Sequence, residues 1–457
     1  MTITRVGFAC FAQRKTDRGD LPLFFFCGLC YNRFSKTRCV GASGRDTMHN
    51  PGLFEPVTKT GTIPAVAGKG IRLWDADGNT YYDLNEISNV LGQRNEHFTK
   101  RMTEKLQGLV GGKVADSPEK RKFYQYLSET TGNRFHYVHL TSSGSEASEW
   151  AVRMALNMTG RNEVLAFWNS IHGRTYLSAS MSGMPRRKQG YAPAAPGVLY
   201  GVYPDCAHCP FEKSCETCDF FCLKFLQLKM KYESSQEIGA VIVEAYQGAG
   251  IVVPPKGWLK ALQDWTHSQG ALFILDEIQS GMGRTGKMYC FEEEGLDPDI
   301  LLLGKALGNG FHVGAALFKQ IPEAFYHPAL IGGAGDTELA YAAGCAVFEE
   351  LLEHGLLEQI ADVSDCLKDR FMQLQARYPA LIKQICCKGL AASIEFQDPE
   401  VFESVQKLVK ENRLITGTAE HQKLIFRPPY VITKEDIDEV AAVLHRCCAL
   451  AEKGCRP

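Results

Sequence analysis

The feature that most constrains the fold of this 457-residue chain is a repeated pattern of strand, turn and helix between about residues 136 and 305. Apolar runs such as AVIVEA (240–245) and ALFILDE (271–277) flank an amphipathic helical segment, GWLKALQDWTHSQG (257–270). Apolar runs of five or six residues are typical of strands that are buried on both faces of a parallel sheet covered by helices. The pattern therefore predicts an α/β fold with a mostly parallel central sheet.

Three of the apolar runs end in a polar residue, namely Glu244, Asp276 and Lys305. In open α/β sheets, ligands bind in the crevice at the carboxyl ends of the strands. We therefore expect these three side chains to meet in one crevice. The other predicted elements of this region are the strands FHYVHL (135–140), EVLAF (163–167) and DILLLGK (299–305), and a helix that SSGSEA (142–147) opens and that continues to about Met158.

The C-terminal third of the sequence has a different pattern, with helical segments around 338–353 and 358–377 and a last amphipathic helix over 434–452. This pattern indicates a smaller α+β domain. A chain of this length also suits two packed domains better than one core. The predicted organisation is an N-terminal part of the small domain over 48–105, a large domain over 106–335 that contains a cysteine-rich insert, and a C-terminal part of the small domain over 336–457.

Residues 1–47 differ from the rest of the sequence, because they hold four cysteines and several arginines without a clear period. We interpret them as a disordered extension or as upstream sequence translated from an early start codon. The alternative is a small metal-binding arm that uses Cys27, Cys30 and Cys39.

Composition and charge exclude several classes of function. The formal net charge of −2 provides no basic surface for nucleic acid or for an anionic membrane. The longest early apolar stretch, LPLFFFCGLCY (21–31), is too short to span a bilayer and lacks the features of a signal peptide. Seventeen cysteines without a secretory signal predict reduced thiols. We therefore expect a cytoplasmic protein that binds neither nucleic acid nor a membrane.

Lys305 is the only charged residue in the run LLLGKALG (301–308). A lysine that is desolvated among leucines has a lowered pKa, and its neutral amine can attack a carbonyl. Asp276 ends the buried run ALFIL, where a carboxylate is costly unless it meets a cation. Taken alone, this aspartate is better explained by a helix cap or a structural salt bridge.

The turn SSGSEA places Gly144 and Ser145 at the start of a helix, where free backbone N–H groups and the helix dipole favour a phosphate. This signal is weak alone, because capped turns between strands and helices are common. An anion site, a carboxylate for a ring cation and an amine nucleophile together describe a site for pyridoxal phosphate (PLP).

Five longer stretches of the sequence match the signature of a known family. They are ILDEIQSGMGRTGKMYCFEEEGLDPDILLLGKALGNG (274–310), SGSEA (143–147), HGRT (172–175), IVEAYQG (242–248) and LWDADGNTYYDL (73–84). Through them the chain resembles the class III (omega-type) aminotransferases, which are PLP enzymes of fold type I, over about residues 51 to 445. The resemblance implies a large domain with a mostly parallel central sheet, a smaller α+β domain built from both chain ends, and a homodimer with active sites at the subunit interface.

The resemblance also implies roles for residues at matching positions. Lys305 would hold PLP as a Schiff base and later move a proton between the amino carbon and the cofactor, and Asp276 would pair with the pyridinium. Gly144 and Ser145 would bind the phosphate. The remaining matches are Gln279 near the cofactor's phenolic oxygen, Glu244 beside the substrate pocket, and His172, for which a structural role is the simpler interpretation.

The sequence departs from the family pattern at three places. Ile171 stands where the family usually has an aromatic residue on the cofactor ring, so aliphatic contact would cover that face. Gly333 replaces a threonine that reaches the phosphate from the partner subunit, and Thr337 is the nearest hydroxyl. Ile425 stands where many members have a carboxylate-binding arginine, which makes Arg427 the candidate for the substrate carboxylate and leaves the substrate open.

The segment DCAHCPFEKSCETCDFFC (205–222) contains two Cys-x-x-Cys pairs and a further cysteine. Such spacing is typical of zinc or iron–sulfur ligation, and the alternative is reduced thiols in a surface insert. Similar inserts occur in the resembled family, where two such cysteines can hold an iron–sulfur cluster between subunits. The candidate ligands are Cys206, Cys209, Cys215, Cys218 and Cys222, with His208 as a bystander.

The sequence therefore predicts a PLP-dependent aminotransferase that moves an amino group from an amino acid or omega-amine to an α-keto acid. An amino acid racemase or an aminomutase is the alternative within PLP chemistry. A non-catalytic metal- or redox-binding protein on the same fold is the alternative of another class, and the presence of both Lys305 and Asp276 counts against it.

Overall fold

The computed structural model describes residues 63–110, 116–190, 194–323 and 335–454. The segment predicted to be an extension, 1–47, lies outside the described residues together with its cysteines, and so does Gly333. In the part of the chain that the structure describes, no helix has both the length and the apolar character needed to cross a membrane.

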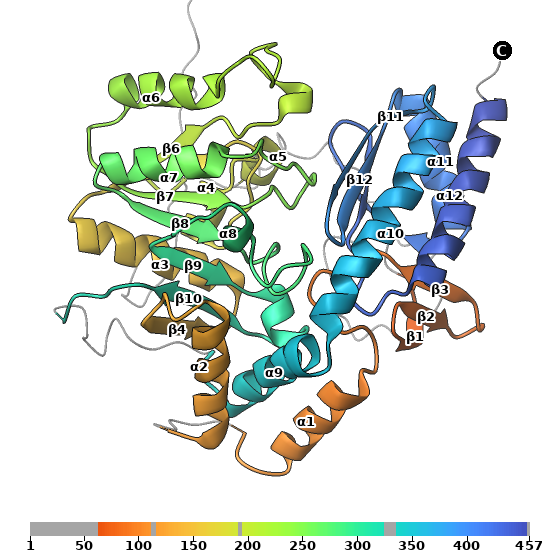
Figure 1. The fold of residues 1–457 in the computed structure, drawn as a ribbon, viewed down its shortest axis with the longest axis horizontal. Coiled ribbons are helices and arrows are strands. Elements are labelled where there is room, and N and C mark those ends of the chain that lie inside the picture. Colours follow the sequence, from red (N-terminus) through yellow and green to blue (C-terminus); the bar gives the residue numbers. More distant parts are fainter. Residues whose placement is uncertain (1–62, 111–115, 191–193, 324–334, 455–457) are drawn as a thin grey trace, which may run out of the picture. The chain divides into compact units, whose positions relative to one another are not determined.

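Seven strands form the central sheet (Figure 1). Their order across the sheet is β4 (Tyr137–Thr141), β10 (Gly314–Phe318), β9 (Ile300–Leu303), β8 (Leu272–Asp276), β7 (Ile238–Glu244), β5 (Glu163–Phe167) and β6 (Val198–Gly201). Only β10 runs against its neighbours β4 and β9 among these described strands, so the sheet is mostly parallel. The predicted α/β fold is therefore confirmed.

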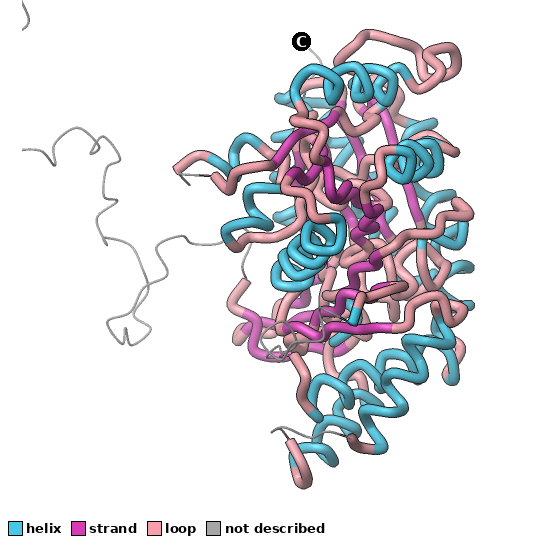
Figure 2. Tube along the Cα trace, turned by 90° about the vertical axis from the view of Figure 1, so that its left-hand side faces the viewer, coloured by secondary structure: helices cyan, strands magenta, loops and turns pink. Residues whose placement is uncertain are grey.

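Both faces of the central sheet are covered by helices, and Figure 2 shows its strands with helices on either side. Alternate residues of β7 pack on opposite faces. Ile242 packs with helix α3 (Gly144–Thr159), whereas Val241 and Val243 belong to the main core together with helix α7 (Trp258–Ser268). Burial on both faces explains why the strands are continuous apolar runs rather than alternating ones.

The remaining described strands form two sheets of four strands each. One contains β1 (Ala65–Lys69), β2 (Arg72–Asp75), β3 (Thr80–Asp83) and β13 (Leu414–Ile415), and the other contains β11 (Ile382–Lys388), β12 (Ala391–Phe396), β15 (Lys423–Phe426) and β14 (Gly417–Ala419). Leu414 pairs with Tyr82, so the first of these sheets combines residues that are far apart in the sequence. The residue boundaries given above for the domains stay a prediction.

Helices occupy most of the remaining described chain. They are α1 (Glu96–Leu106), α2 (Pro118–Thr130), α4 (Tyr176–Met181), α5 (Pro185–Lys188), α6 (Phe221–Glu233), α8 (Cys290–Glu293), α9 (Glu338–Phe348), α10 (Leu356–Arg377), α11 (Pro399–Glu411) and α12 (Lys434–Gly454). Tight 3₁₀ turns cover Cys206–His208 and Lys305–Gly308, and a π-helical turn at Glu349–Glu353 follows α9.

The strands predicted from the sequence agree with the structure to within two residues at either end. The prediction and the structure differ in where the strand before Lys305 ends. The predicted strand DILLLGK ends at Leu303, so Lys305 lies in the 3₁₀ turn after β9 and not at the end of the strand itself. The sequence also does not predict β6 or β10.

Candidate active site

A cavity of about 370 Å³ opens at the carboxyl ends of β7 and β8. Glu244 and Asp276 end these two strands, lie opposite each other in the register of the sheet and line the cavity. Lys305 lines it from the turn after β9. The three polar residues thus lie around one crevice, as the sequence predicts. The cavity is also lined by Gly144, Ser145, Ile171, Gln279 and Arg427.

The backbone of Lys305 has a φ of 45°, in the left-handed region that non-glycine residues rarely adopt. Residues in such conformations concentrate at functional sites. Burial lowers the pKa of the Lys305 amine, although the carboxylates of Asp276 and Glu244 oppose this shift. The guanidinium groups of Arg427 and Arg174 lower the pKa further. The surroundings therefore shift the amine towards its neutral, nucleophilic form.

The buried carboxylate of Asp276 is held by two contacts. Its Oδ2 lies 2.7 Å from Nδ1 of His172, and its Oδ1 accepts a hydrogen bond from the backbone N–H of Ile278 at 3.0 Å. His172 is itself buried, and its backbone N–H donates to the hydroxyl of Ser182 at 3.1 Å. The histidine thus fixes the orientation of the carboxylate, which is the structural role that the sequence suggests for it.

Glu244 is buried at the end of β7 and accepts two backbone hydrogen bonds. The donors are the N–H groups of Ile171 and of Gly248, the latter at 2.7 Å. Burial raises the pKa of Glu244 to about 7, and the neighbouring carboxylate of Asp276 raises it too, whereas His172 and the two backbone donors lower it. Near neutral pH this side chain can therefore exchange a proton.

The start of α3, the predicted anion site, lies beside these residues. Ser143 caps the helix by accepting a hydrogen bond from the backbone N–H of Glu146 at 3.3 Å. Gly144 and Ser145, in the first turn of the helix, line the cavity. The hydroxyl of Ser145 accepts a hydrogen bond from the backbone N–H of Arg174 at 3.1 Å. Free N–H groups and the dipole of a 16-residue helix favour a phosphate there.

Four buried polar atoms of residues that line the cavity have no hydrogen-bond partner among the described residues. They are Oε1 of Gln279, Nε2 of His172 and the hydroxyl oxygens of Tyr246 and Ser280. Unpaired buried polar atoms are rare, and one explanation is a ligand that pairs with them. Together with the amine of Lys305, the carboxylate of Asp276 and the anion site at α3, they fit a cofactor with an aldehyde, a ring nitrogen and a phosphate, which PLP combines.

Arg427 enters the cavity from the residue after β15. Its guanidinium donates to Oδ1 of Asn85 at 3.0 and 2.7 Å and to the carbonyl of Gly248 at 3.0 Å. These partners are neutral, and within the described ranges no carboxylate forms an ion pair with Arg427. Burial lowers its pKa to about 10. A half-buried guanidinium whose hydrogen-bond partners are all neutral is a suitable partner for an anionic ligand.

The family model for class-III aminotransferases matches residues 56–448. The chain belongs to this family. Among curated relatives, a leucine/methionine racemase of Thermococcus litoralis is 29% identical over 86% of this chain and 92% of its own length. An acetylornithine aminotransferase of Bacillus subtilis is 32% identical over 83% of this chain and 94% of its own.

A solved structure, taurine:2-oxoglutarate aminotransferase from Bifidobacterium kashiwanohense in complex with PLP and glutamate, is similar with a TM-score of 0.79. It is 22% identical in sequence and covers 88% of this chain and 96% of its own. This similarity shows the fold type I architecture that class-III aminotransferases have.

Thr337, the predicted phosphate ligand from the partner subunit of this aminotransferase, does not line the cavity of its own chain. It is the N-cap of α9, and its hydroxyl accepts a hydrogen bond from the backbone N–H of Ala340 at 3.2 Å. Capping gives this threonine a structural role within the chain. Its contact with a phosphate across a subunit interface stays a prediction.

The cavity of this class-III aminotransferase also has lining residues that the sequence does not predict. Among them are Arg174, Arg186 and Arg187, from the HGRT motif and from α5. The adjacent arginines in MPRRKQG are visible in the sequence, but nothing in their spacing places α5 at the crevice. Only the folded chain brings this segment to the ends of β7 and β8.

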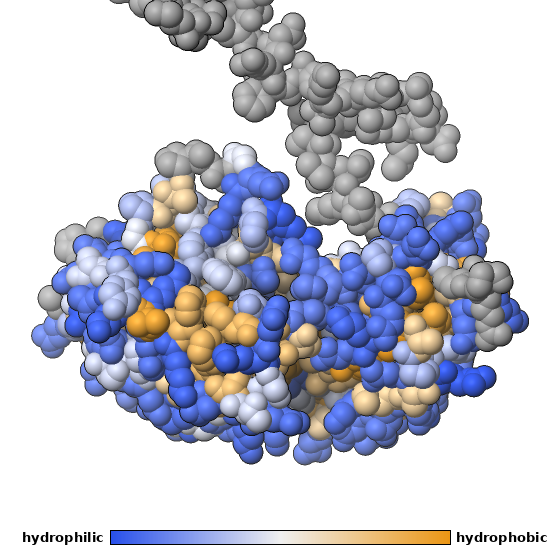
Figure 3. Space-filling view, turned by 90° about the horizontal axis from the view of Figure 1, so that it is seen from above, coloured by the Kyte–Doolittle hydropathy of each residue, from blue (hydrophilic) through white to orange (hydrophobic). Residues whose placement is uncertain are grey.

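The five candidate cysteine ligands line one small cavity beside α6. All five are free thiols, and burial together with Cys215 raises the pKa of Cys206 to about 12. Hydrophobic residues gather on part of the face that Figure 3 shows. Leu228 of α6 is one of the exposed large hydrophobic residues among the described ones. His208 is held between carboxylate oxygens of Asp205 and Glu395, at 3.0 and 2.9 Å, and its role as a bystander stays a prediction.

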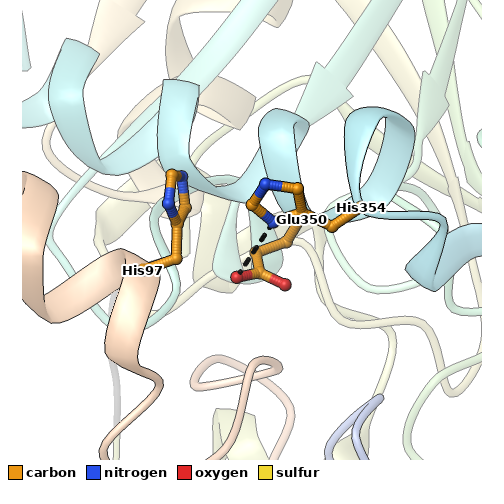
Figure 4. Close-up of side chains that lie close together, drawn as sticks. All are labelled: His97, Glu350 and His354. Atoms are coloured by element: carbon orange, nitrogen blue, oxygen red, sulfur yellow. Dashed lines mark ion pairs between the residues drawn. The ribbon is translucent and has the colours of Figure 1, made fainter.

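Two groups of other side chains bring three potential metal ligands within 4.8 Å of one another in the described chain, and neither contains a cysteine of the insert. One is Asp205, His208 and His421. The other is His97, Glu350 and His354, where α1 meets the π-helical turn (Figure 4). His97 also lies 2.6 Å from the carboxylate of Glu349 through its Nε2.

Proposed function

We propose that this class-III enzyme moves an amino group from an amino acid or an omega-amine to an α-keto acid. The observation that carries the proposal is the placement of Lys305, Asp276 and Glu244 around one cavity beside the start of α3. Family membership supports the same PLP-dependent chemistry.

PLP, when bound, supplies the electron sink that makes the proton on the substrate's amino carbon removable. Lys305 would hold the cofactor, and when the substrate's amine has taken its place there, its freed amine would accept that proton and return it. The carboxylate of Asp276 would keep a proton on the ring nitrogen, and His172 keeps that carboxylate in place. Gly144 and Ser145 would bind the phosphate, Ile171 would cover one ring face, and Gln279 would offer a polar group to the ring.

Arg427 is the proposed partner of the substrate carboxylate. Its support is the half-buried guanidinium whose hydrogen-bond partners are neutral, which gains an ion pair when a carboxylate enters. Glu244, with its raised pKa, faces the same space and can take up or release a proton as a charged substrate enters.

A borohydride experiment tests the role of Lys305 directly. Reduction of the purified protein with borohydride, digestion and mass spectrometry should reveal a pyridoxyl adduct on the peptide that contains Lys305. A Lys305→Ala variant should lack this adduct and the associated absorbance. An unmodified Lys305 in protein supplied with excess PLP would contradict the proposal and would favour the non-catalytic alternative.

A racemase is the second candidate, because one relative is a leucine/methionine racemase at 29% identity. The same lysine can serve either reaction, and an aminomutase would use it too. A transaminase stops after one half-turnover without a keto acid, whereas a racemase or an aminomutase continues. Turnover that does not depend on a keto acid would therefore replace the transaminase proposal.

The proposed enzyme is a cytoplasmic homodimer, by resemblance to its family. Light scattering after size-exclusion chromatography should give twice the monomer mass.

The proposal for the insert is that five cysteines hold zinc or an iron–sulfur cluster in a structural or redox role. They are Cys206, Cys209, Cys215, Cys218 and Cys222, and the support for the proposal is that all five line one cavity. Metal analysis of protein purified without oxygen, beside a variant with all five changed to serine, tests it.

A further inference from the structure

Three potential metal ligands lie side by side where helix α1 meets the π-helical turn after α9. They are His97, Glu350 and His354, and one ligand atom of each lies within 4.8 Å of those of the other two. Figure 4 shows the two imidazole rings next to each other with the carboxylate beside them. Two histidines and one glutamate are a ligand set that zinc uses in proteins. None of the three lines the active-site cavity, so the proposed reaction does not explain them.

The contact between His97 and Glu349 leaves one nitrogen of the imidazole free. Nε2 of His97 lies 2.6 Å from the carboxylate of Glu349. That carboxylate also accepts hydrogen bonds from the ammonium of Lys122 at 2.5 Å and from Nε of Arg101 at 3.1 Å, so it is ionised and can only accept. Nε2 of His97 therefore donates. Nδ1 of the neutral ring, which has no hydrogen-bond partner among the described residues, is then the basic nitrogen that a metal needs.

The side chains behind the cluster hold two of the ligands in place. Histidines that bind a metal almost always donate their second ring N–H to a carboxylate, a carbonyl or water, which fixes the ring and makes it more basic. Glu349 provides this contact for His97. Asn95 supports Glu350, because its side-chain amide donates to Oε1 at 3.3 Å. The amide oxygen of Asn95 caps α1 by accepting from the backbone N–H of Phe98 at 2.8 Å, which leaves its NH₂ group for Glu350.

The backbone that carries the other two ligands is irregular. Glu350 lies within the π-helical turn Glu349–Glu353, which the backbone N–H of His354 closes by donating to the carbonyl of Glu349 at 2.9 Å. Such turns are rare and occur frequently at functional sites. In this turn Nδ1 of His354 lies 3.5 Å from Oε1 of Glu350. The His354 ring also meets the His97 ring edge-on, with centroids 4.8 Å apart, so all three ligands face one another.

The other group of three potential ligands in the described chain lacks a free nitrogen at its centre. Both ring nitrogens of His208 contact carboxylates, of Asp205 at 3.0 Å and of Glu395 at 2.9 Å. The ammonium of Lys383 also lies 3.5 Å from Nε2 of His208. A metal cation would meet an occupied ring and a positive charge there, whereas the ring of His97 has one nitrogen available.

We propose that His97, Glu350 and His354 bind one zinc ion, which ties the start of α1 to the turn after α9. Zinc with three protein ligands keeps a fourth, tetrahedral position for water. The side chain of His354 is 48% exposed, so solvent can reach that position. The site is separate from the cysteine insert, and the proposal does not rest on the aminotransferase function.

Equilibrium dialysis of the PLP-loaded enzyme against zinc, after treatment with EDTA, tests the proposal by comparing variants. His354→Ala removes an exposed ligand, so the fold should be kept and one zinc per chain should be lost relative to the wild type. Glu350→Gln should weaken binding at the same site at least tenfold. His267→Ala is the matched control, because His267 is also exposed and lies 2.8 Å from a carboxylate, that of Asp299, but belongs to neither group of three ligands in the described chain. It should keep the wild-type zinc count.

Cobalt in place of zinc separates this site from the cysteines. Co²⁺ bound by nitrogen and oxygen has weak visible absorbance, whereas thiolate ligands add an intense charge-transfer band in the near ultraviolet. The spectrum of the wild type minus that of His354→Ala, in which the cofactor's absorbance cancels, should therefore contain the visible bands without the thiolate band. Equal metal counts in the two proteins would overturn the proposal and leave a polar network only. A thiolate band in the difference would overturn it as well, because the lost ion would then belong to cysteines.

Discussion

At the scale of single residues, the site depends on how the chain compensates charges that it has removed from water. Asp276 is 4% exposed, and burying a lone carboxylate is costly. The contact with His172 and the backbone N–H of Ile278 offset part of this cost. They also leave the carboxylate in one orientation. A charge fixed in this way can stabilise a cation on a bound ring without rearrangement during the reaction.

Changing Asp276 to asparagine isolates this charge. The variant keeps a side-chain oxygen that can accept from Ile278, so we expect it to fold, but it cannot hold a proton on a ring nitrogen. The kcat should fall by about 10²–10⁴-fold, the range for loss of a positioned acid or base. Steady-state kinetics with PLP in excess provide the measurement. A kcat within about twofold of the wild type would remove Asp276 from the proposed machinery.

At the scale of elements, Arg284 connects the central sheet with the smaller sheets. It follows β8 and is 1% exposed. Its guanidinium donates to the carbonyls of Leu390 at 3.0 Å, Pro428 at 2.6 Å and Glu86 at 3.3 Å. The same group lies 4.6 Å from the centroid of the Tyr430 ring. Since Pro428 follows Arg427 in the chain, Arg284 also helps to position Arg427, the proposed partner of the substrate carboxylate.

We therefore expect Arg284→Lys to cost stability and substrate affinity together. A lysine keeps the charge but cannot reach three carbonyls in different directions. Two buried acceptors left without a donor should lower the free energy of unfolding by roughly 2–6 kcal/mol. Chemical denaturation and the KM for the amino donor are the measurements. Arg121→Lys, at an exposed pair with Asp116, is the control and should change stability by less than about 0.5 kcal/mol.

The sequence predicts the elements whose signals are local and misses those that depend on distant pairing. The runs that became β5, β7 and β8 are apolar along their whole length because both faces are buried, and that signal is visible residue by residue. The run GAALF of β10 is equally buried. Its antiparallel direction, between β4 and β9, is decided by a chain path that no local pattern contains.

The same distinction separates the predicted from the unpredicted site residues. Glu244 and Asp276 are visible because a polar residue ends each apolar strand, and the shared edge of a parallel sheet brings such ends together. The arginines of α5 carry no such signal, because a short helix in a long connection can lie anywhere on the surface. The left-handed backbone of Lys305 is likewise a consequence of the turn that follows β9.

At the scale of the whole molecule, the centre of the fold contains carboxyl groups that resist ionisation. Glu277 follows Asp276 and is 1% exposed. Its oxygens accept hydrogen bonds from the backbone N–H groups of Cys290 and Phe291, both at 2.8 Å. Burial nevertheless raises its pKa to about 8, and the neighbouring carboxylates of Glu292 and Glu293 raise it as well. The stability of the protein should therefore depend on pH through this side chain.

The direction of this dependence follows from proton linkage. Glu277 is ionised above about pH 4.5 in the unfolded chain, whereas the folded chain keeps it protonated up to about pH 8. Its favourable contribution to the free energy of unfolding is therefore complete at low pH and is lost as the pH rises from about 4.5 to about 8. A glutamine at position 277 cannot titrate. Relative to the wild type, Glu277→Gln should therefore gain on the order of 4 kcal/mol in unfolding free energy between pH 5 and pH 8.

Denaturant unfolding of both proteins at several pH values measures this relative gain, which is independent of any constant cost of the amide in the hydrogen bonds to Cys290 and Phe291. The exposed Glu400, changed to glutamine, is the control and should give a curve parallel to the wild type. Parallel curves for Glu277→Gln as well would mean that the folded protein ionises this carboxyl as easily as the unfolded chain does. In that case a cation or water must reach the centre of the fold beside the proposed active site, where burial is also what lowers the pKa of Lys305.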